Sequence, residues 1–337
     1  MTPRREDGFA LVTTLWFLAL LALVAVVVEG WISAALERAT ALQERVESRA
    51  ALIGATDHLA LVMVTSGFSA RGIEFVPQAS EARGTGGTLP PRRPSIALDG
   101  RPYRLGSVTV RLQDEGGLYD LSNPARDSLE KLLLGYGVAP SVAENMTAAL
   151  VSYARKPSNV RAAGASRDAD YTHAGLPAPR HAPLLTPWEP YRILGWRQKD
   201  ALWRGPSSLG DIVTTGPIGG LNINAAPAKI LAALTGMDER EAARVVAART
   251  LHPITELGDL PGGLGEVAAP VDRPLTLLPS NIIRLKLSEM DDPLVHIVSI
   301  RLTPGAAAPY RIDYVVDLPA DAATPAAPEA PTLPAIR

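Results

Sequence analysis

One stretch of the sequence, residues 9–28, contains no charged residue and consists mostly of Leu, Val and Ala. As a helix, these 20 residues span about 30 Å at ~1.5 Å per residue, which matches the hydrocarbon thickness of a bilayer. A cleaved secretory signal has a shorter apolar region, of about 7–15 residues, followed by small residues at the cleavage site. Here the small residues 33–35 come only after Glu29, Gly30 and Trp31. We therefore predict a membrane-spanning helix.

The residues on either side of this span predict its orientation and its length. Arg4 and Arg5 precede the span and favour a cytoplasmic N-terminus, with the rest of the chain outside, although Glu6 and Asp7 dilute this charge. No Pro interrupts residues 9–65, and beyond the span apolar residues recur every three or four positions. This spacing predicts that one helix continues through residue 65 and turns one apolar side to the following domain.

Composition excludes several classes of protein. The chain has 337 residues, with 33 Lys and Arg, 35 Asp and Glu, and a net charge of -2, so its overall charge does not attract nucleic acid. With 0 Cys it has no disulfide, no thiolate metal site and no cysteine nucleophile. The absence of Cys still permits an oxidising compartment. The compartment must therefore be inferred from other features.

Residues for catalysis do not occur in recognisable patterns. Residues 205–210 miss the spacing of a Gly-x-Ser-x-Gly nucleophile turn, and the glycines of residues 84–87 lie in a Pro- and Arg-rich loop rather than between a strand and a helix. No His-Glu-x-x-His or comparable close pair is formed by the five histidines, His58, His173, His181, His252 and His296. We predict that the protein is not an enzyme. A membrane-anchored hydrolase remains a rival without a named nucleophile.

The N-terminal residues 4–15, RREDGFALVTTL, resemble the class III signal of type IV pilins and pseudopilins. The resemblance implies that residues 1–8 are a leader, that a prepilin peptidase cuts after Gly8 on the cytoplasmic side, and that Phe9 becomes the methylated N-terminus. Most pilins carry Glu at the fifth mature position, where this chain has Thr13. A carboxylate in hydrocarbon is costly unless paired, and in pilins it is inferred to meet the N-terminal amine of a neighbouring subunit.

In lacking that Glu, the chain resembles the K-type minor pseudopilin of type II secretion systems, which is inferred to cap the filament. The alternative is that Thr13 is an accidental substitution in an ordinary pilin. Two further segments resemble the K type: residues 114–123, DEGGLYDLSN, and residues 219–227, GGLNINAAP, in which Asn222, Asn224 and Ala225 match the family's Asn-hydrophobic-Asn motif. The two segments also resemble each other, which indicates a weak internal duplication.

Residues 164–171 and 187–195 resemble blocks near which family members bind calcium through acidic residues, an ion that takes about 6–8 oxygen ligands. Ser166 stands where the family has Glu. By this resemblance Asp168 and Asp170 are the candidate ligands, and calcium is the one cofactor suggested. The alternative is that both are solvated loop acids.

Residues 221–260 also resemble a helix-hairpin-helix, which presents backbone N–H groups to phosphate. This resemblance gives an alternative function, a membrane-anchored periplasmic DNA-binding protein. Two features argue against it. Asp238 replaces the second Gly of the hairpin, and the segment carries five acidic and four basic residues: Asp238, Glu239, Glu241, Glu256 and Asp259 against Lys229, Arg240, Arg244 and Arg249.

The remaining pattern predicts strands. An Asp99-Gly100 turn within residues 95–113 indicates a hairpin, and residues 281–287, 294–302 and 310–316 are rich in β-branched residues. The predicted fold class is therefore α+β: a long N-terminal transmembrane helix and a pilin-like head, whose antiparallel sheet is interrupted by an inserted α-helical domain. The predicted domains are a leader (1–8), a membrane and filament-core helix (9–28), its continuation on the head (29–65), the first part of the head (66–115), the insert (116–275), the C-terminal strands (276–318) and a disordered Ala- and Pro-rich tail (319–337).

Together the resemblance implies a K-type minor pseudopilin at the tip of the pseudopilus, which supports the start of assembly and protein export across the outer membrane. The implied partners are the I-type and J-type minor pseudopilins, the prepilin peptidase and the inner membrane, with no nucleic acid. The implied location is the bacterial inner membrane, crossed once, with the head in the periplasm.

Overall fold

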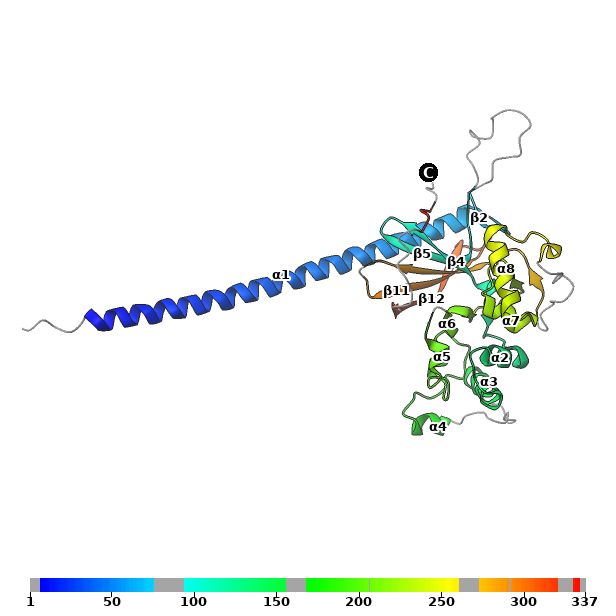
Figure 1. Ribbon diagram of the computed structural model, residues 1–337, viewed down its shortest axis with the longest axis horizontal. Helices are drawn as coiled ribbons and strands as arrows, with labels where there is room; N and C mark the ends of the chain where they lie inside the picture. The colour runs from blue at the N-terminus through cyan, green and yellow to red at the C-terminus, as the bar shows by residue number, and fades with distance from the viewer. Residues whose placement is uncertain are drawn as a thin grey trace, which may run out of the picture. The chain divides into compact units, whose positions relative to one another are not determined.

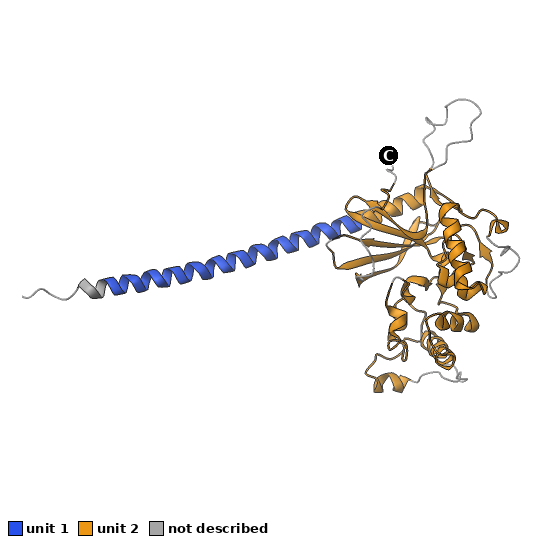
Figure 2. Cartoon of the chain, in the orientation of Figure 1, with its two compact units in different colours: residues 1–53 blue, residues 54–337 orange. Residues whose placement is uncertain are grey.

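The computed structural model describes residues 7–75, 94–155, 168–205, 207–260, 273–290, 292–320 and 330–333, with side chains from residue 11 onward. The chain divides into two compact units, Met1–Ile53 and Gly54–Arg337 (Figure 2). Helix α1, Asp7–Thr65, runs through the first unit and ends in the second (Figure 1). The predicted single helix is therefore confirmed.

The second unit contains a five-stranded antiparallel sheet with the strand order β12-β11-β10-β5-β4. Its strands come from both sides of the helical region: β4 (Asp99–Leu105), β5 (Val108–Asp114), β10 (Ile282–Ser288), β11 (Leu294–Leu302) and β12 (Tyr310–Pro319). Because β5 pairs directly with β10, everything between them in the sequence is an insertion between neighbouring strands. The predicted α+β class, with a sheet interrupted by helices, is confirmed.

One turn of the sheet was predicted at the wrong place. The chain reverses at Gly106-Ser107, between β4 and β5, where Gly106 has φ +62°, a conformation that suits Gly. Gly100 also has a positive φ, +80°, but it lies where the register of β4 shifts against β5. The Asp99 side chain accepts the N–H of Arg101 at this irregularity. The Asp-Gly pair thus marks a bulge rather than the hairpin turn.

The end of α1 belongs to the core of the second unit. Buried side chains recur along residues 54–65 with helical spacing: Ala55, Thr56, Leu59, Ala60, Val62 and Met63. A small sheet follows, made of β1 (Gly67–Ser69), β2 (Gly72–Glu74) and β3 (Ser95–Ile96), with Ile73 and Ile96 buried. Packing of α1 on the head, predicted for residues 29–65, is therefore described for the segment that starts at Gly54.

The insertion is mainly helical. Its elements are the 3-10 turn η2 (Glu115–Gly117), β6 (Tyr119–Asp120), α2 (Arg126–Leu134), α3 (Pro140–Ala154), α4 (Asp168–His173), η3 (Glu189–Arg192), α5 (Asp200–Trp203), α6 (Leu209–Ile212), β7 (Val213–Thr214), β8 (Leu221–Asn222), α7 (Ala228–Thr235), α8 (Glu239–Leu251), η4 (Leu257–Asp259) and β9 (Leu275–Thr276). One apolar cluster joins them, with Tyr119, Trp196, Leu209 and Ile230 fully buried. The helix pair expected within residues 221–260 is found as α7 and α8.

The two similar sequence segments have similar local structures and contact each other. Each has a short strand, β6 or β8, followed by a helix pair, α2–α3 or α7–α8, and α2 contacts α7. Gly117 lies against the backbone of the second segment: a Cβ at this position would come within 2.5 Å of the carbonyl carbon of Ala225. Gly117 is therefore required by the close approach of two backbones.

Part of the tail predicted to be disordered is ordered. Strand β12 runs to Pro319, and Thr332 forms a parallel bridge with Arg104 of β4. The Arg104 N–H donates to the Pro331 carbonyl at 2.9 Å, and the Leu333 N–H donates to the Arg104 carbonyl at 2.8 Å. Leu333 is buried. The free edge of β4 thus offers the tail backbone partners that sequence composition does not reveal; residues 321–329 and 334–337 lie outside the described residues.

Candidate functional site

The N-terminal helix is the first functional feature. Within the described ranges, α1 is the one helix that is long and apolar enough to cross a membrane. Its apolar side chains are exposed in the single chain, with Trp16 and Trp31 each 75 % exposed. Gly8 and Phe9 belong to the first turn of α1, but their side chains lie outside the description. Thr13 lies one turn further along, half-buried.

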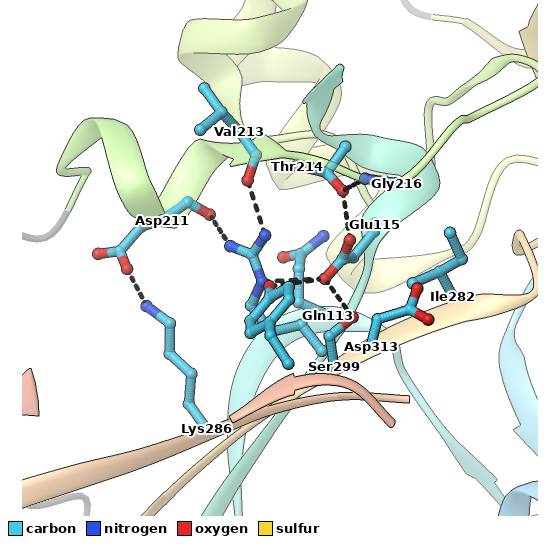
Figure 3. Close-up of polar contacts among 12 residues, drawn as sticks. Gln113, Glu115, Asp211, Val213, Thr214, Gly216, Ile282, Lys286, Ser299 and Asp313 are labelled. Carbon is cyan, nitrogen blue, oxygen red and sulfur yellow. Dashed lines mark hydrogen bonds and ion pairs between the residues drawn. The ribbon is translucent and has the colours of Figure 1, made fainter. Parts of the chain in front are cut away.

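The second feature is a buried ion pair where the sheet meets the insert (Figure 3). Glu115 directly follows β5, and its Oε1 accepts hydrogen bonds from Arg284 Nε at 3.2 Å, Ser299 Oγ at 2.9 Å and Tyr314 Oη at 2.9 Å. Its Oε2 accepts from the Thr214 hydroxyl. The acceptors of this buried carboxylate are thus engaged by four donors from β7, β10, β11 and β12.

Besides its hydrogen bond to Glu115, Arg284 also binds the insert. This side chain projects from β10 and is fully buried. It donates to the carbonyls of Gly210 at 2.9 Å, Asp211 at 3.2 Å and Val213 at 2.7 Å. Two residues along the strand, Lys286 forms an ion pair with the Asp211 side chain (Figure 3). Two basic residues of one strand therefore hold α6 and β7 against the sheet.

The surroundings of Arg284 favour its charged form. Burial by itself lowers the pKa of Arg284, but Tyr314, Glu115 and Asp211 outweigh it, and the pKa is raised overall. Burial is also the main reason that the pKa of the Tyr314 phenol is raised, so the phenol stays protonated and donates to Glu115. Every group of the cluster is used for hydrogen bonding, and none is left exposed to a substrate. The arrangement is suited to holding two parts of a fold together.

Asp114, one residue earlier, connects the two ends of the insert. Its Oδ1 accepts from Gly116 N at 2.9 Å, Ser280 N at 3.1 Å and Ser280 Oγ at 2.5 Å, and its Oδ2 accepts from Asn222 Nδ2 at 2.7 Å. Burial raises the pKa of Asp114, and these hydrogen bonds oppose the rise. Asp114 therefore ties the start of the insert, at Gly116, to its end, at Ser280.

The predicted Asn motif has a structural role of the same kind. Asn224 Nδ2 donates to the carbonyls of Ile254 at 2.8 Å and Leu277 at 3.2 Å, while its Oδ1 accepts from Ile254 N at 2.9 Å. The Asn222 side-chain oxygen accepts from Asn224 N at 3.0 Å. Ala225 contributes its carbonyl, which accepts from Gln113 of β5 at 3.0 Å. The three predicted residues thus lie together, between the sheet and the second helix pair.

The candidate calcium ligands lie together on one short helix. Asp168 and Asp170 both lie on α4, and Asp168 Oδ1 is 3.1 Å from His181 Nε2. The Asp168 side chain is 63 % exposed. Within the described residues, no group of three or more His, Cys, Asp or Glu side chains could hold a metal ion. The preceding Ser166 lies outside the described residues.

The hairpin before α8 differs from a phosphate-binding one. Asp238 caps this helix: its Oδ1 accepts from Glu241 N at 2.7 Å, and Glu241 Oε2 accepts from Asp238 N at 3.0 Å. Two N–H groups at the start of this helix, those of Asp238 and Glu241, are therefore bonded to carboxylates of the chain itself. Arg249, counted as a basic charge of this segment, is buried and donates to backbone carbonyls.

Arg284 and Arg249 were not among the predicted site residues. In residues 281–287 the apolar Ile283, Leu285 and Leu287 alternate on one face, so Arg284 and Lys286 must share the other face. That alternation is the signal that could have indicated a basic pair facing the insert. The partner Glu115 is 169 positions away in the sequence, and no local pattern connects the two.

Comparisons with known proteins find a likeness in structure. No protein-family model matches the chain, and no curated protein matches it. The chain is similar in structure to a chain of the GspK-GspI-GspJ complex from the enterotoxigenic Escherichia coli type 2 secretion system, with a TM-score of 0.45 and 16 % sequence identity, over 67 % of this chain and 87 % of that chain. A likeness of this size carries no inference about function.

Proposed function

We propose that the protein is a minor pseudopilin of the K type, anchored in the bacterial inner membrane by α1 with its head in the periplasm. One observation carries the proposal: the pilin-like sequence of residues 4–15 leads directly into a charge-free stretch, residues 9–28, at the start of a helix that runs without a break to Thr65. A secreted protein with a cleaved signal has no need of such a continuous helix. A pilin-type subunit uses it first as an anchor and then as the filament core.

The proposed processing step cuts between Gly8 and Phe9. Removal of the leader leaves a mature chain whose first 20 residues are uncharged except for the new amino group. An amine in hydrocarbon requires a partner, which in pilins is the Glu of a neighbour. Thr13 supplies no such charge to a subunit placed above. A subunit of this kind is suited to the tip, where no other subunit lies above it.

The head fits the same role. Because the insert lies between β5 and β10 and is joined to both, the head is much larger than the sheet alone. The buried Glu115–Arg284 pair and the Asp114–Ser280 contact hold this bulk firmly on the sheet. The proposed partners are the I-type and J-type minor pseudopilins, and the proposed outcome is the start of pseudopilus assembly and protein export across the outer membrane.

Mass spectrometry of the N-terminus, after co-expression with a prepilin peptidase, tests the proposal. We expect the mature chain to begin at N-methylated Phe9. Gly8→Ala should stay uncut, whereas Gly30→Ala, a matched change on the same helix with no neighbouring atom within 4 Å, should be cut normally. An intact Met1 in the unaltered chain, or a cut near Ala35, would contradict the proposal.

A further inference from the structure

A small polar cavity lies in the second unit, where three distant parts of the chain meet. Its volume is about 30 Å³. The β1–β2 turn contributes Arg71, the start of β4 contributes Asp99 and Arg101, and the insert contributes Asn224 and Arg249. The cavity lining contains neither residue of the Glu115–Arg284 pair.

Arg249 is the unusual group in this cavity. The residue is 5 % exposed, and its Nη1 donates to the carbonyls of Ile223 and Ala226, the latter at 2.6 Å. Its Nε is buried and has no hydrogen-bond partner. Among the described residues, Arg249 forms no ion pair with a carboxylate. A buried guanidinium without a counter-charge is strongly destabilising, so a further partner is expected.

The carboxylate of the cavity lining is already engaged. Asp99 accepts from Arg101 Nε at 2.9 Å and from Arg101 Nη2 at 2.6 Å, a two-point ion pair. The cavity lining therefore contains three Arg residues, Arg71, Arg101 and Arg249, against one carboxylate that is already paired. Burial lowers the pKa of Arg249 to about 10, with the Asp99 charge acting the other way, so the group is still cationic at neutral pH. The cavity is thus positively charged.

We propose that this cavity binds one small monovalent anion, a halide or a formate-sized carboxylate, beside Arg249. One water requires about 10–15 Å³ on the same scale, so a cavity of about 30 Å³ has room for an anion of this size. The anion supplies the missing counter-charge. It also links the β1–β2 turn after α1, the sheet and the Asn motif of the insert.

Thermal unfolding of the full-length chain in detergent tests the site. The salts are sodium chloride, sodium formate and sodium gluconate at equal ionic strength, gluconate being too large for the cavity. We expect chloride or formate to raise Tm by about 2–4 °C, saturating with concentration, as a ligand of the folded state does. A response to chloride alone identifies a halide site, and one to formate alone a carboxylate site. Equal Tm in all three salts overturns the proposal and leaves a water-filled cavity.

Two variants test whether Arg249 carries the effect. Arg249→Gln should abolish the anion-dependent rise in Tm. Arg244→Gln removes the same charge from the same helix, where the side chain is 67 % exposed, and should keep the rise. If Arg249→Gln does not fold, Arg71→Gln should weaken the anion response several-fold. A crystal grown in sodium bromide gives an independent measurement: an anomalous peak in the cavity beside Arg249 supports the proposal, and an empty cavity overturns it.

Discussion

Replacing Arg284 by Met tests whether the buried pair joins the insert to the sheet. Met has similar length and no charge, so Arg284→Met leaves Glu115 as a buried, unpaired carboxylate. Removing one partner of a buried ion pair destabilises a protein by about 3–5 kcal/mol. The change also removes donors from three carbonyls, those of Gly210, Asp211 and Val213, at about 1–3 kcal/mol each where water cannot replace them. We expect a loss of at least ~4 kcal/mol in the free energy of unfolding.

The assay is urea unfolding of the full-length chain, followed by tryptophan fluorescence, because Trp188 lies 5.5 Å from the Arg284 guanidinium and packs on Tyr314. Arg311→Gln is the matched control: it lies in the same sheet, and its side chain is 64 % exposed beside Asp313. Exposed pairs contribute about 0–1 kcal/mol, so this control should change little.

A double-mutant cycle decides whether the effect comes from the pair. Glu115→Gln removes the negative charge but keeps an acceptor for Ser299 and Tyr314. If the pair is coupled, Arg284→Met combined with Glu115→Gln should be less destabilised than the sum of the single changes, by about 1–3 kcal/mol. Strict additivity, or a loss below ~1 kcal/mol for Arg284→Met alone, would refute the reasoning.

Three further predictions concern other parts of the second unit. Gly117→Ala should lower the free energy of unfolding, measured in urea, by about 1–3 kcal/mol, because the new Cβ would lie 2.5 Å from the Ala225 backbone. Gly219→Ala places its Cβ with no atom within 4 Å and should be close to neutral. Equal effects of the two changes would contradict this. Leu333→Asp should detach the tail from β4 and expose a sheet edge, and light scattering should then show self-association. Thr332→Asp alters an exposed side chain and should cause no self-association. A Leu333→Asp protein that stays monomeric would argue against an exposed edge. Burial raises the pKa of Asp99, but Arg101 outweighs it and the pKa is lowered below 3.8, so this carboxylate stabilises the fold above pH 3.8 and loses its contribution as pH falls below that value. Asp99→Asn should flatten that part of the stability–pH curve, and an unchanged curve would show that the pair contributes nothing.

The parts of the fold that were predictable depend on short-range pattern. The helix of residues 9–65 follows from uninterrupted apolar spacing, and the strands around Val110, Leu285 and Val298 follow from β-branched alternation. The hairpin turn was predicted at the wrong place because Asp99-Gly100 and Gly106-Ser107 both supply a Gly suited to positive φ. Only the register with β5 distinguishes a bulge from a turn. Order at Leu333 depends on the open edge of β4, more than 200 residues away.

The candidate site was predictable only in part, for a related reason. Asn222, Asn224 and Ala225 were found by their resemblance to a motif, but what they bind, such as Asp114 and Ile254, is set by the meeting of distant segments. Arg284 joins Glu115 to three carbonyls of the insert and stands in a strand that is mostly apolar. A charge that is buried and satisfied by backbone carbonyls has no signature in composition or charge count.

The position of the insert explains why these polar residues gather where they do. Asp114 and Ile283 are partners in the β5–β10 ladder, so the chain leaves the sheet and returns to it at adjacent points. An insertion held only by these two connections could pivot on them. Asp114, bound to both Gly116 and Ser280, closes the base, and Arg284 binds α6 and β7 at a second place. Two separated attachments prevent rotation about either one. In a subunit whose proposed role depends on a bulky head at the tip of a filament, this arrangement keeps the added mass fixed to the sheet of the unit in which α1 ends.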